Sequence, residues 1–121
     1  NPPSNFAEQR LLPKLIMNLV DNSFTAVAEQ PNPRVRLTWM AGYNEERILT
    51  VANNGPVISS RDGKMIFQGG VTSKSNSSGR HGWGLVICKR IAQELGGSLT
   101  YESSTQETNF ILTLPPCTSS N

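Results

Sequence analysis

The chain has 121 residues, 36% of them hydrophobic, and a formal net charge of +2, which fits one domain with a small hydrophobic core. No run of Lys and Arg is interleaved with aromatic residues, so the sequence does not indicate a nucleic-acid-binding protein. No apolar run is long enough to span a bilayer and no signal peptide is visible, so we predict no membrane contact by this domain.

Both ends of the chain are polar or rich in Pro, and we expect them to be frayed around an ordered core of about residues 6–116. The first residue is not Met, which suggests a piece of a longer protein. The two cysteines lie in unlike surroundings, Cys88 in an apolar helical pattern and Cys117 in a polar tail. Neither pattern indicates a disulfide or a metal site, so a reducing cytoplasm is the simplest location.

The first predicted element is a helix over about residues 11–29. Its apolar positions follow helical spacing: Leu12, Leu15, Ile16, Leu19, Val20 and Val27. Pro13 suits the first turn, and Pro31 and Pro33 end the helix. The opposite, polar stripe contains Asn18 and Asn22, which lie four residues apart and therefore project from one face.

Two asparagines on one helix face invite an explanation, because the Asn amide competes for backbone hydrogen bonds and disfavours helix interiors. Each amide offers a carbonyl oxygen, which is a hard, neutral ligand suited to Mg²⁺ beside phosphate oxygens. The alternative is an ordinary solvated face of the helix.

Two strands come next, over residues 35–40 and 48–52, joined by a hairpin connection over residues 41–46. The second strand stops at Asn53, Asn54 and Gly55. Amides at the end of a strand can present hydrogen-bonding groups to a planar heterocyclic base, and a glycine beside them lets the backbone come close to that base. An ordinary Asn-Gly turn is the alternative.

A short helical turn is predicted over residues 62–67, and a long loop rich in Gly and Ser over residues 69–84. The loop leads into a second helix over residues 85–95, whose N-terminal amides favour phosphate. A flexible connector is the alternative interpretation of this loop. Gly96 and Gly97 supply the helix C-cap, and strands over residues 98–102 and 109–114 close the chain.

The element order is helix, hairpin, loop, helix, hairpin. This order predicts an α/β fold of two layers, a mixed, largely antiparallel sheet with helices on one face.

The polar segments also share a family order, and together they resemble the ATPase superfamily of sensor histidine kinases, DNA gyrase, heat-shock-90 chaperones and MutL. Residues 15–23 resemble the N box, residues 53–58 the first glycine box, and residues 65–74 the F box and the start of the ATP lid. Residues 82–91 resemble the second glycine box with its helix, and residues 95–99 its Gly-Gly turn. The resemblance covers about residues 11–115 and implies the Bergerat-type ATPase (GHKL, HATPase) fold.

The resemblance implies ATP and Mg²⁺ as cofactors. It assigns Asn22 to Mg²⁺, and Asn18 to the phosphates or to a water on the metal. Asn53 would read adenine, with Gly55 allowing close approach, and Lys74 and Arg80 would contact phosphates. The cofactor-binding set implied by the boxes is Asn18, Asn22, Asn53, Gly55, Val57, Ile58, Phe67, Thr72, Lys74, Arg80, Gly82, Trp83, Gly84 and Leu85.

The N box points to one branch of the superfamily. Gyrase-like members have a Glu general base four residues before the metal-binding Asn, and Asn18 holds that position here. A neutral amide is not a base at pH 7. The resemblance therefore implies a histidine kinase catalytic domain, with Asn18 and Asn22 as its catalytic residues, that positions ATP for transfer rather than hydrolysing it quickly.

The sequence departs from the family pattern in three places, which concern the adenine pocket and the ATP lid. Asn53 stands where Asp is usual beneath adenine, and an amide that can rotate would discriminate less against GTP. Val57 replaces the second glycine of its box and could narrow the pocket. Arg80 and Trp83 replace residues common in the second glycine box, and Trp83 could anchor the lid or cover nucleotide.

The family's phosphoryl group goes to a histidine on a separate dimerisation domain of the same protein, then to a response regulator of a two-component system. That histidine-bearing helix is absent from residues 1–121, and His81 lies in the lid. We therefore expect a fragment of a longer, cytoplasmic or membrane-anchored phosphoprotein kinase, inactive in phosphotransfer without its partner domain. The alternatives are a nucleotide-free pseudo-ATPase interaction module of the same fold and a weak ATP hydrolase.

Overall fold

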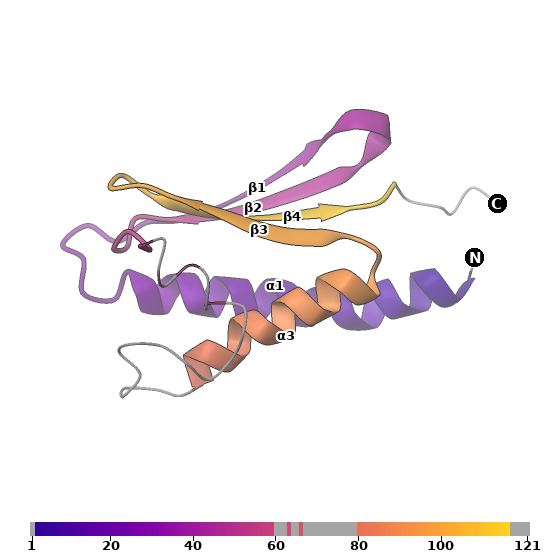
Figure 1. The fold of residues 1–121 in the computed structure, drawn as a ribbon, viewed down its shortest axis with the longest axis horizontal. Helices are drawn as coiled ribbons and strands as arrows, with labels where there is room; N and C mark the ends of the chain where they lie inside the picture. The colour runs from indigo at the N-terminus through magenta and orange to yellow at the C-terminus, as the bar shows by residue number, and fades with distance from the viewer. Residues whose placement is uncertain (1, 60–62, 64–65, 67–79, 117–121) are drawn as a thin grey trace.

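The computed structural model describes residues 2–59, 63, 66 and 80–116. Figure 1 shows these residues as a sheet lying over a pair of helices. In chain order the elements are α1 (Pro2–Ala26), β1 (Val35–Ala41), a 3₁₀ turn (Tyr43–Glu45), β2 (Arg47–Asn53), α3 (Arg80–Glu94), β3 (Ser98–Ser103) and β4 (Thr108–Leu114). The described helices include none that is long and apolar enough to cross a bilayer.

The sheet of the described residues has four strands in the order β1-β2-β4-β3. Each neighbouring pair is antiparallel, including β2 with β4, which are far apart in the sequence. Both helices lie on one face of this sheet (Figure 1). The predicted α/β two-layer fold is confirmed, and no described strand pair is parallel.

The core lies between the sheet and the helices. Strand β4 alternates strictly, because Thr108, Phe110, Leu112 and Leu114 are buried whereas the residues between them are half-buried. Strand pairing places Leu49 and Val51 of β2 beside Leu112 and Phe110 on the same face. The helices fill this face with buried side chains at helical spacing: Leu15 and Leu19 from α1, and Leu85, Cys88, Ile91 and Ala92 from α3.

The first helix is longer at its start than predicted. It begins at Pro2, not near residue 11, so Pro2 to Ser4 are helical rather than frayed. Two prolines suit a first turn because its N–H groups have no intrahelical partner. Pro13 consequently lies inside α1 rather than in its first turn, where it offers no N–H to the carbonyl four residues earlier. The helix ends at Ala26, five residues before Pro31.

The second helix also begins earlier than predicted, at Arg80 instead of Leu85. Its end agrees with the prediction. Gly96 has a φ of +80°, its N–H donates to the carbonyl of Gln93 at 3.0 Å, and the N–H of Gly97 donates to Ala92 at 2.9 Å. This pair of bonds is a Schellman cap, for which glycine is the favoured residue.

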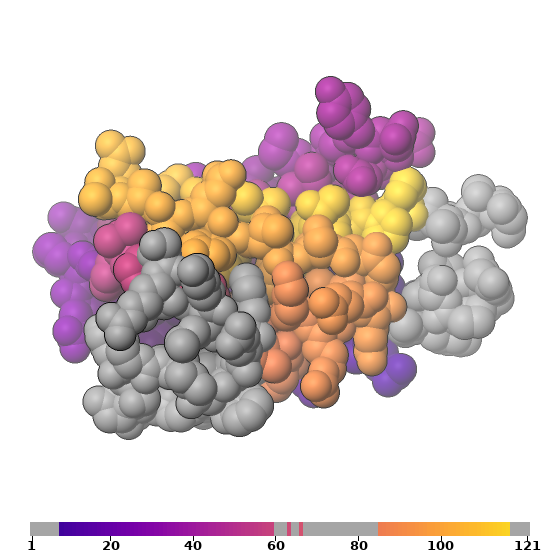
Figure 2. Space-filling model, viewed as in Figure 1, coloured from indigo at the N-terminus to yellow at the C-terminus, as the bar shows by residue number. Residues whose placement is uncertain are grey.

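Strand β1 lies at one edge of the sheet, and the helices do not cover it. Leu37 and Trp39 are opposite Val51 and Leu49, on the helix-facing side, yet 46% and 51% of their surfaces are exposed. The β1–β2 hairpin rises away from the helices in Figure 1 and projects from the top of the surface in Figure 2.

Candidate functional site

Three segments singled out in the sequence lie at one end of the molecule. The C-terminal half of α1, the last residues of β2 and the first residues of α3 all lie at the left of Figure 1. Direct contacts join two of these elements, because α1 and β2 meet through a hydrogen bond between Asn53 and Ser23. The separate sequence motifs are therefore parts of one region.

Asn18 and Asn22 lie one helical turn apart on α1, and both are half-buried. No described residue hydrogen-bonds to either side chain. They flank Leu19 and Ser23, which are buried against the sheet. Their amides are consequently held at the edge of the core with free hydrogen-bonding capacity, which is the arrangement that a ligand-binding amide needs.

Asn53 ends β2 and is almost fully buried, with 3% of its surface exposed. Its Oδ1 accepts a hydrogen bond from the backbone N–H of Gly55 at 2.8 Å. Its Nδ2 donates to the hydroxyl of Ser23 at 3.3 Å. The carboxamide thus bridges helix α1 and the glycine-containing turn that follows β2.

The neighbouring residues fix this turn from both sides. Asn54 accepts a bond from the N–H of Arg34 at 2.8 Å and donates to the carbonyl of Asn32 at 2.7 Å. Gly55 lies so close to α1 that an added Cβ would come within 2.6 Å of the Ala26 carbonyl oxygen. The close approach that glycine allows here is therefore to the end of helix α1.

Val57 and Ile58 continue this turn beside the β3–β4 hairpin. The N–H of Ile58 donates to Ser103 Oγ at 2.8 Å, and Ser103 shares a 2.6 Å hydrogen bond with Thr108. Ile58 also packs against the core, whereas 49% of Val57 is exposed. The two hydroxyls therefore hold the end of the first glycine box, residues 53–58, in place.

The glycine-rich start of α3 is helical rather than a loop. Arg80, Gly82, Trp83 and Gly84 all lie within α3. The first four N–H groups of a helix have no partner within the helix. In α3, which begins at Arg80, the N–H of Gly82 is one of these four, whereas the N–H of Gly84 is not. Leu85 is buried in the core. Phe67, Thr72 and Lys74 lie outside the described residues, as does the predicted loop over residues 69–84 as far as residue 79.

Sequence reasoning did not single out Ser23, Ser103 or Thr108. Ser23 is fully buried within the apolar side of α1, and Thr108 is 2% exposed. A buried hydroxyl in an apolar stripe is a signal that a polar partner lies opposite, since buried polar groups are nearly always hydrogen-bonded. The identity of that partner depends on tertiary contacts that the sequence does not reveal.

The described residues contain no group of three or more His, Cys, Asp or Glu side chains that could hold a metal ion. The oxygen donors without a described partner in this region include the carboxamides of Asn18 and Asn22. The Asn22 amide fits Mg²⁺, because a neutral oxygen donor is a normal Mg²⁺ ligand beside phosphate.

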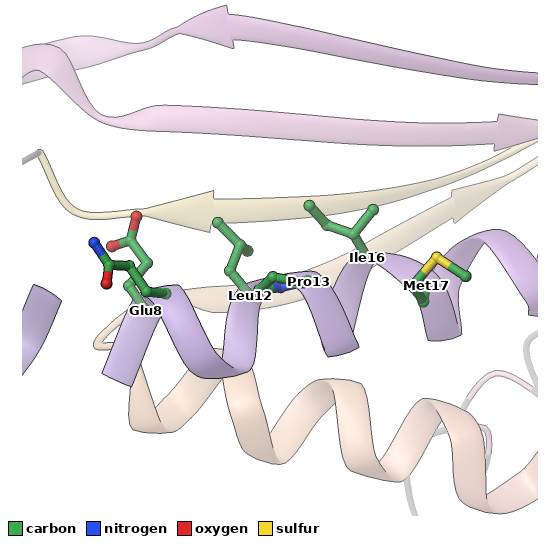
Figure 3. A pocket seen from close by; sticks show the side chains of 6 residues that line it. Glu8, Leu12, Pro13, Ile16 and Met17 are labelled. Atoms are coloured by element: carbon green, nitrogen blue, oxygen red, sulfur yellow. The ribbon is translucent and has the colours of Figure 1, made fainter. Parts of the chain in front are cut away.

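A separate pocket of about 580 Å³ runs along α1 from Glu8 to Met17. It is lined by Glu8, Gln9, Leu12, Pro13, Ile16 and Met17. Figure 3 shows Glu8, Leu12 and Ile16 projecting from α1 toward the sheet. None of the predicted site residues lines this pocket, so it is separate from the region around Asn22 and Asn53.

The sequence model of the family described as "Histidine kinase-, DNA gyrase B-, and HSP90-like ATPase" matches residues 7–118. The adaptive-response sensory kinase SasA of Prochlorococcus marinus (strain MIT 9215) is 29% identical over 116 residues. That alignment covers 93% of this chain but only 31% of SasA, so the chain spans less than a third of this relative.

Solved structures share the fold. The nucleotide-free catalytic domain of histidine kinase ThkA has a TM-score of 0.72 and 28% identity, over 86% of this chain and 65% of that one. Full-length ShkA, crystallised in complex with AMPPNP, also has a TM-score of 0.72, over 91% of this chain and 22% of that one. At 23% identity, the ShkA similarity establishes the fold alone.

Proposed function

This chain belongs to the histidine kinase-, DNA gyrase B- and HSP90-like ATPase family, and we propose that it binds Mg-ATP and presents the γ-phosphate for transfer to a histidine. The relatives compared are sensor histidine kinases, which supports the kinase branch. The observation that carries the proposal is the Ser23–Asn53 contact, because it joins the helix that bears Asn18 and Asn22 to the strand end that bears the first glycine box.

In the proposed complex, Asn22 supplies an oxygen ligand to Mg²⁺, and Asn18 supports the phosphates or a metal-bound water. When bound, Mg²⁺ would neutralise charge on the phosphate oxygens during transfer. The half-buried position and the unused hydrogen-bonding capacity of both amides favour these roles. Neither amide is a general base, so rapid hydrolysis of ATP by an activated water is not expected.

The adenine would bind beside Asn53, at the edge between α1 and the turn after β2. Gly55, Val57 and Ile58 would form the wall of that edge. The N-terminal turn of α3 would face the phosphates, because free amides and the positive end of a helix favour anions. In this proposal Phe67, Thr72, Lys74 and Arg80 contribute from the lid segment and the start of α3.

The phosphoryl acceptor would be a histidine on a dimerisation domain of the same protein, and the final acceptor a response regulator. The matching family is one of ATPases, which supports ATP as the nucleotide here. Catalysis would consist mainly of positioning and charge neutralisation. The domain alone is expected to bind ATP without labelling itself, because His81 lies in the first turn of α3 and not on an acceptor helix.

Calorimetric titration with Mg-ATP tests this proposal through Asn22→Ala. Losing an oxygen ligand to a charged site should weaken binding by about 2–3 kcal/mol, comparable with a hydrogen bond to a charged group. The fold should persist, because Asn22 has no described hydrogen-bond partner to lose.

Asn109→Ala is the matched control, since Asn109 lies on β4 between the buried residues Thr108 and Phe110 and faces away from the helices. It should bind Mg-ATP as the parent does. If Asn22→Ala and the parent bound ATP with equal affinity at saturating Mg²⁺, Asn22 would not be a Mg²⁺ ligand. A parent that binds no ATP would favour the pseudo-ATPase interaction module.

A further inference from the structure

The carboxamide of Asn53 is held by two contacts that cannot exchange places. The N–H of Gly55 donates to Oδ1 at 2.8 Å, and Nδ2 donates to Ser23 Oγ at 3.3 Å. A backbone N–H can only donate, so the atom that faces Gly55 must be the oxygen. Rotating the carboxamide by half a turn would place two donors against each other at a buried position, where an unmade hydrogen bond is costly.

Ser23 determines where the other half of the carboxamide points. Its side chain is fully buried on α1, and its hydroxyl accepts from Nδ2. The Ser23 hydroxyl belongs to α1, and the Gly55 N–H belongs to the turn after β2. A carboxamide that bonds to both groups can neither rotate about its last bond nor point elsewhere. Without Ser23, only the Gly55 contact would remain.

The fixed carboxamide has hydrogen-bonding capacity left over. Of its two N–H groups and two oxygen lone pairs, one of each is used by Ser23 and Gly55. No described residue takes the others, although only 3% of Asn53 is exposed. Buried polar groups usually have partners, so one unused donor and one unused acceptor on this buried carboxamide point to a ligand as their partner.

We propose that Ser23 is a positioning residue that fixes the Asn53 carboxamide in one orientation and thereby sets its preference between 6-amino and 6-oxo purines. A 6-amino purine such as adenine has an amino donor at position 6 beside an acceptor at ring nitrogen N1. A 6-oxo purine such as guanine has an oxygen acceptor at position 6 beside an N–H donor at N1. A fixed amide matches one order only. This inference rests on the proposed ATP-binding function, and it replaces the expectation that the Asn53 amide rotates to suit either base.

The test compares Ser23→Ala in two backgrounds, the parent and Asn53→Asp. A carboxylate has two equivalent acceptor oxygens, so it has no orientation for Ser23 to fix. Affinities for Mg-ATP and Mg-GTP are measured by calorimetry in the parent, each single variant and the double variant. Ser98→Ala, which removes an exposed hydroxyl at the start of β3, is the control.

With Asn53 present, Ser23→Ala should lower the ATP-to-GTP affinity ratio about 5- to 10-fold, the size expected for one hydrogen bond. With Asp at this position, the same change should alter the ratio by about twofold or less. Ser98→Ala should change neither affinity. If Ser23→Ala lowered the ATP-to-GTP affinity ratio equally in both backgrounds, Ser23 would act through packing alone and the proposal would fail. A ratio that Ser23→Ala leaves unchanged in both backgrounds would also overturn it.

Hydrogen exchange at the Gly55 amide tests the same arrangement without nucleotide. Ser23→Ala should accelerate this exchange about 10-fold when Asn53 is present, because the acceptor is then less well held. In the Asn53→Asp background, where a carboxylate still accepts from Gly55, exchange should stay slow. If the parent bound neither nucleotide, the proposed function would fail, and the Gly55 exchange rates would still decide whether Ser23 fixes Asn53. Unchanged exchange in Ser23→Ala would overturn the inference.

Discussion

At the scale of single residues, the candidate site is built from polar groups that mostly bond to the protein itself. Asn53 and Asn54 use their amides to tie the turn after β2 to α1 and to the chain before β1. Asn18 and Asn22 differ, because no described residue uses their amides. The distinction separates residues that shape the site from residues that are available to a ligand.

Gly55→Ala should destabilise the protein even in the absence of nucleotide. An added Cβ would meet the backbone carbonyl of Ala26 at 2.6 Å, and backbone cannot easily move away. Overpacking of this kind typically costs about 1–3 kcal/mol. Urea unfolding would measure the loss.

Gly42→Ala is the matched comparison for Gly55→Ala. Its Cβ would meet the flexible end of the Ile48 side chain at 2.7 Å, and rotation of that side chain can relieve the contact. The loss should therefore be clearly smaller. Equal stability of Gly55→Ala and the parent would contradict the close packing of the turn against α1.

Cys88 should be chemically inert in the folded protein. Burial raises the pKa of its thiol from 9.0 to about 12, and the thiolate is the reactive form. In a Cys117→Ser background, a thiol reagent at pH 8 should therefore modify Cys88 only after unfolding. Modification of the native protein at the rate of a free thiol would contradict this burial.

The same shift predicts the sign of a pH effect. Above pH 9 the unfolded chain loses the thiol proton while the native state keeps it, so stability should fall by about 1.4 kcal/mol per pH unit toward pH 12. Below pH 9 the contribution is fully present. Cys88→Ala should lack this component, and parallel pH profiles for the two proteins would contradict the raised pKa.

At the scale of elements, the positions of the strands were predictable and the starts of both helices were not. The turn residues that bound them place all four predicted strands within one residue of their observed ends. Pro13 predicts a first helical turn at about residue 11, whereas Pro2 and Pro3 occupy the first turn of α1. Glycines 82 and 84 suggested a loop, but helix packing outweighs their weak propensity.

Part of the site was equally predictable. The spacing of Asn18 and Asn22 requires a shared face on any helix, and Asn53 and Gly55 follow the strand predicted over residues 48–52. The contact between Ser23 and Asn53 joins residues 30 positions apart. Such a contact depends on how α1 crosses the sheet, which local sequence patterns do not specify.

One ion pair attaches the N-terminal half of α1 to the sheet, and Arg47→Ala should reveal its contribution. Arg47 binds the Glu8 carboxylate with two nitrogens, and also donates to the carbonyl of Pro115 at 2.7 Å and 3.0 Å. Both side chains of the pair are about 70% buried. Removing these charge-assisted bonds should cost about 1–3 kcal/mol in the free energy of unfolding.

The Arg36–Glu107 pair provides the contrast for this prediction. Its atoms are 3.3 Å apart and the Arg36 side chain is 62% exposed, so Arg36→Ala should cost less than about 1 kcal/mol. Urea denaturation of both variants gives the comparison. If the two substitutions cost the same, the Glu8–Arg47–Pro115 contacts do not secure α1.

At the scale of the whole molecule, the proposed nucleotide site and the Glu8–Arg47 ion pair lie at different ends of α1. Its N-terminal half carries the ion pair and borders the pocket of about 580 Å³, whereas its C-terminal half carries Asn18, Asn22 and Ser23. A family likeness that covers residues 7–118 does not by itself say which end binds a ligand. The hydrogen-bonded turn after β2 favours the C-terminal end.

A nuclear magnetic resonance titration with Mg-AMPPNP tests this placement most directly. The backbone amide signals of Asn22, Asn53 and Gly55 should shift as the analogue is added, while those of Gln9 and Leu12, which line the other pocket, should stay in place. Shifts confined to Gln9 and Leu12, or no shifts at saturating analogue, would contradict a nucleotide site between α1 and the end of β2.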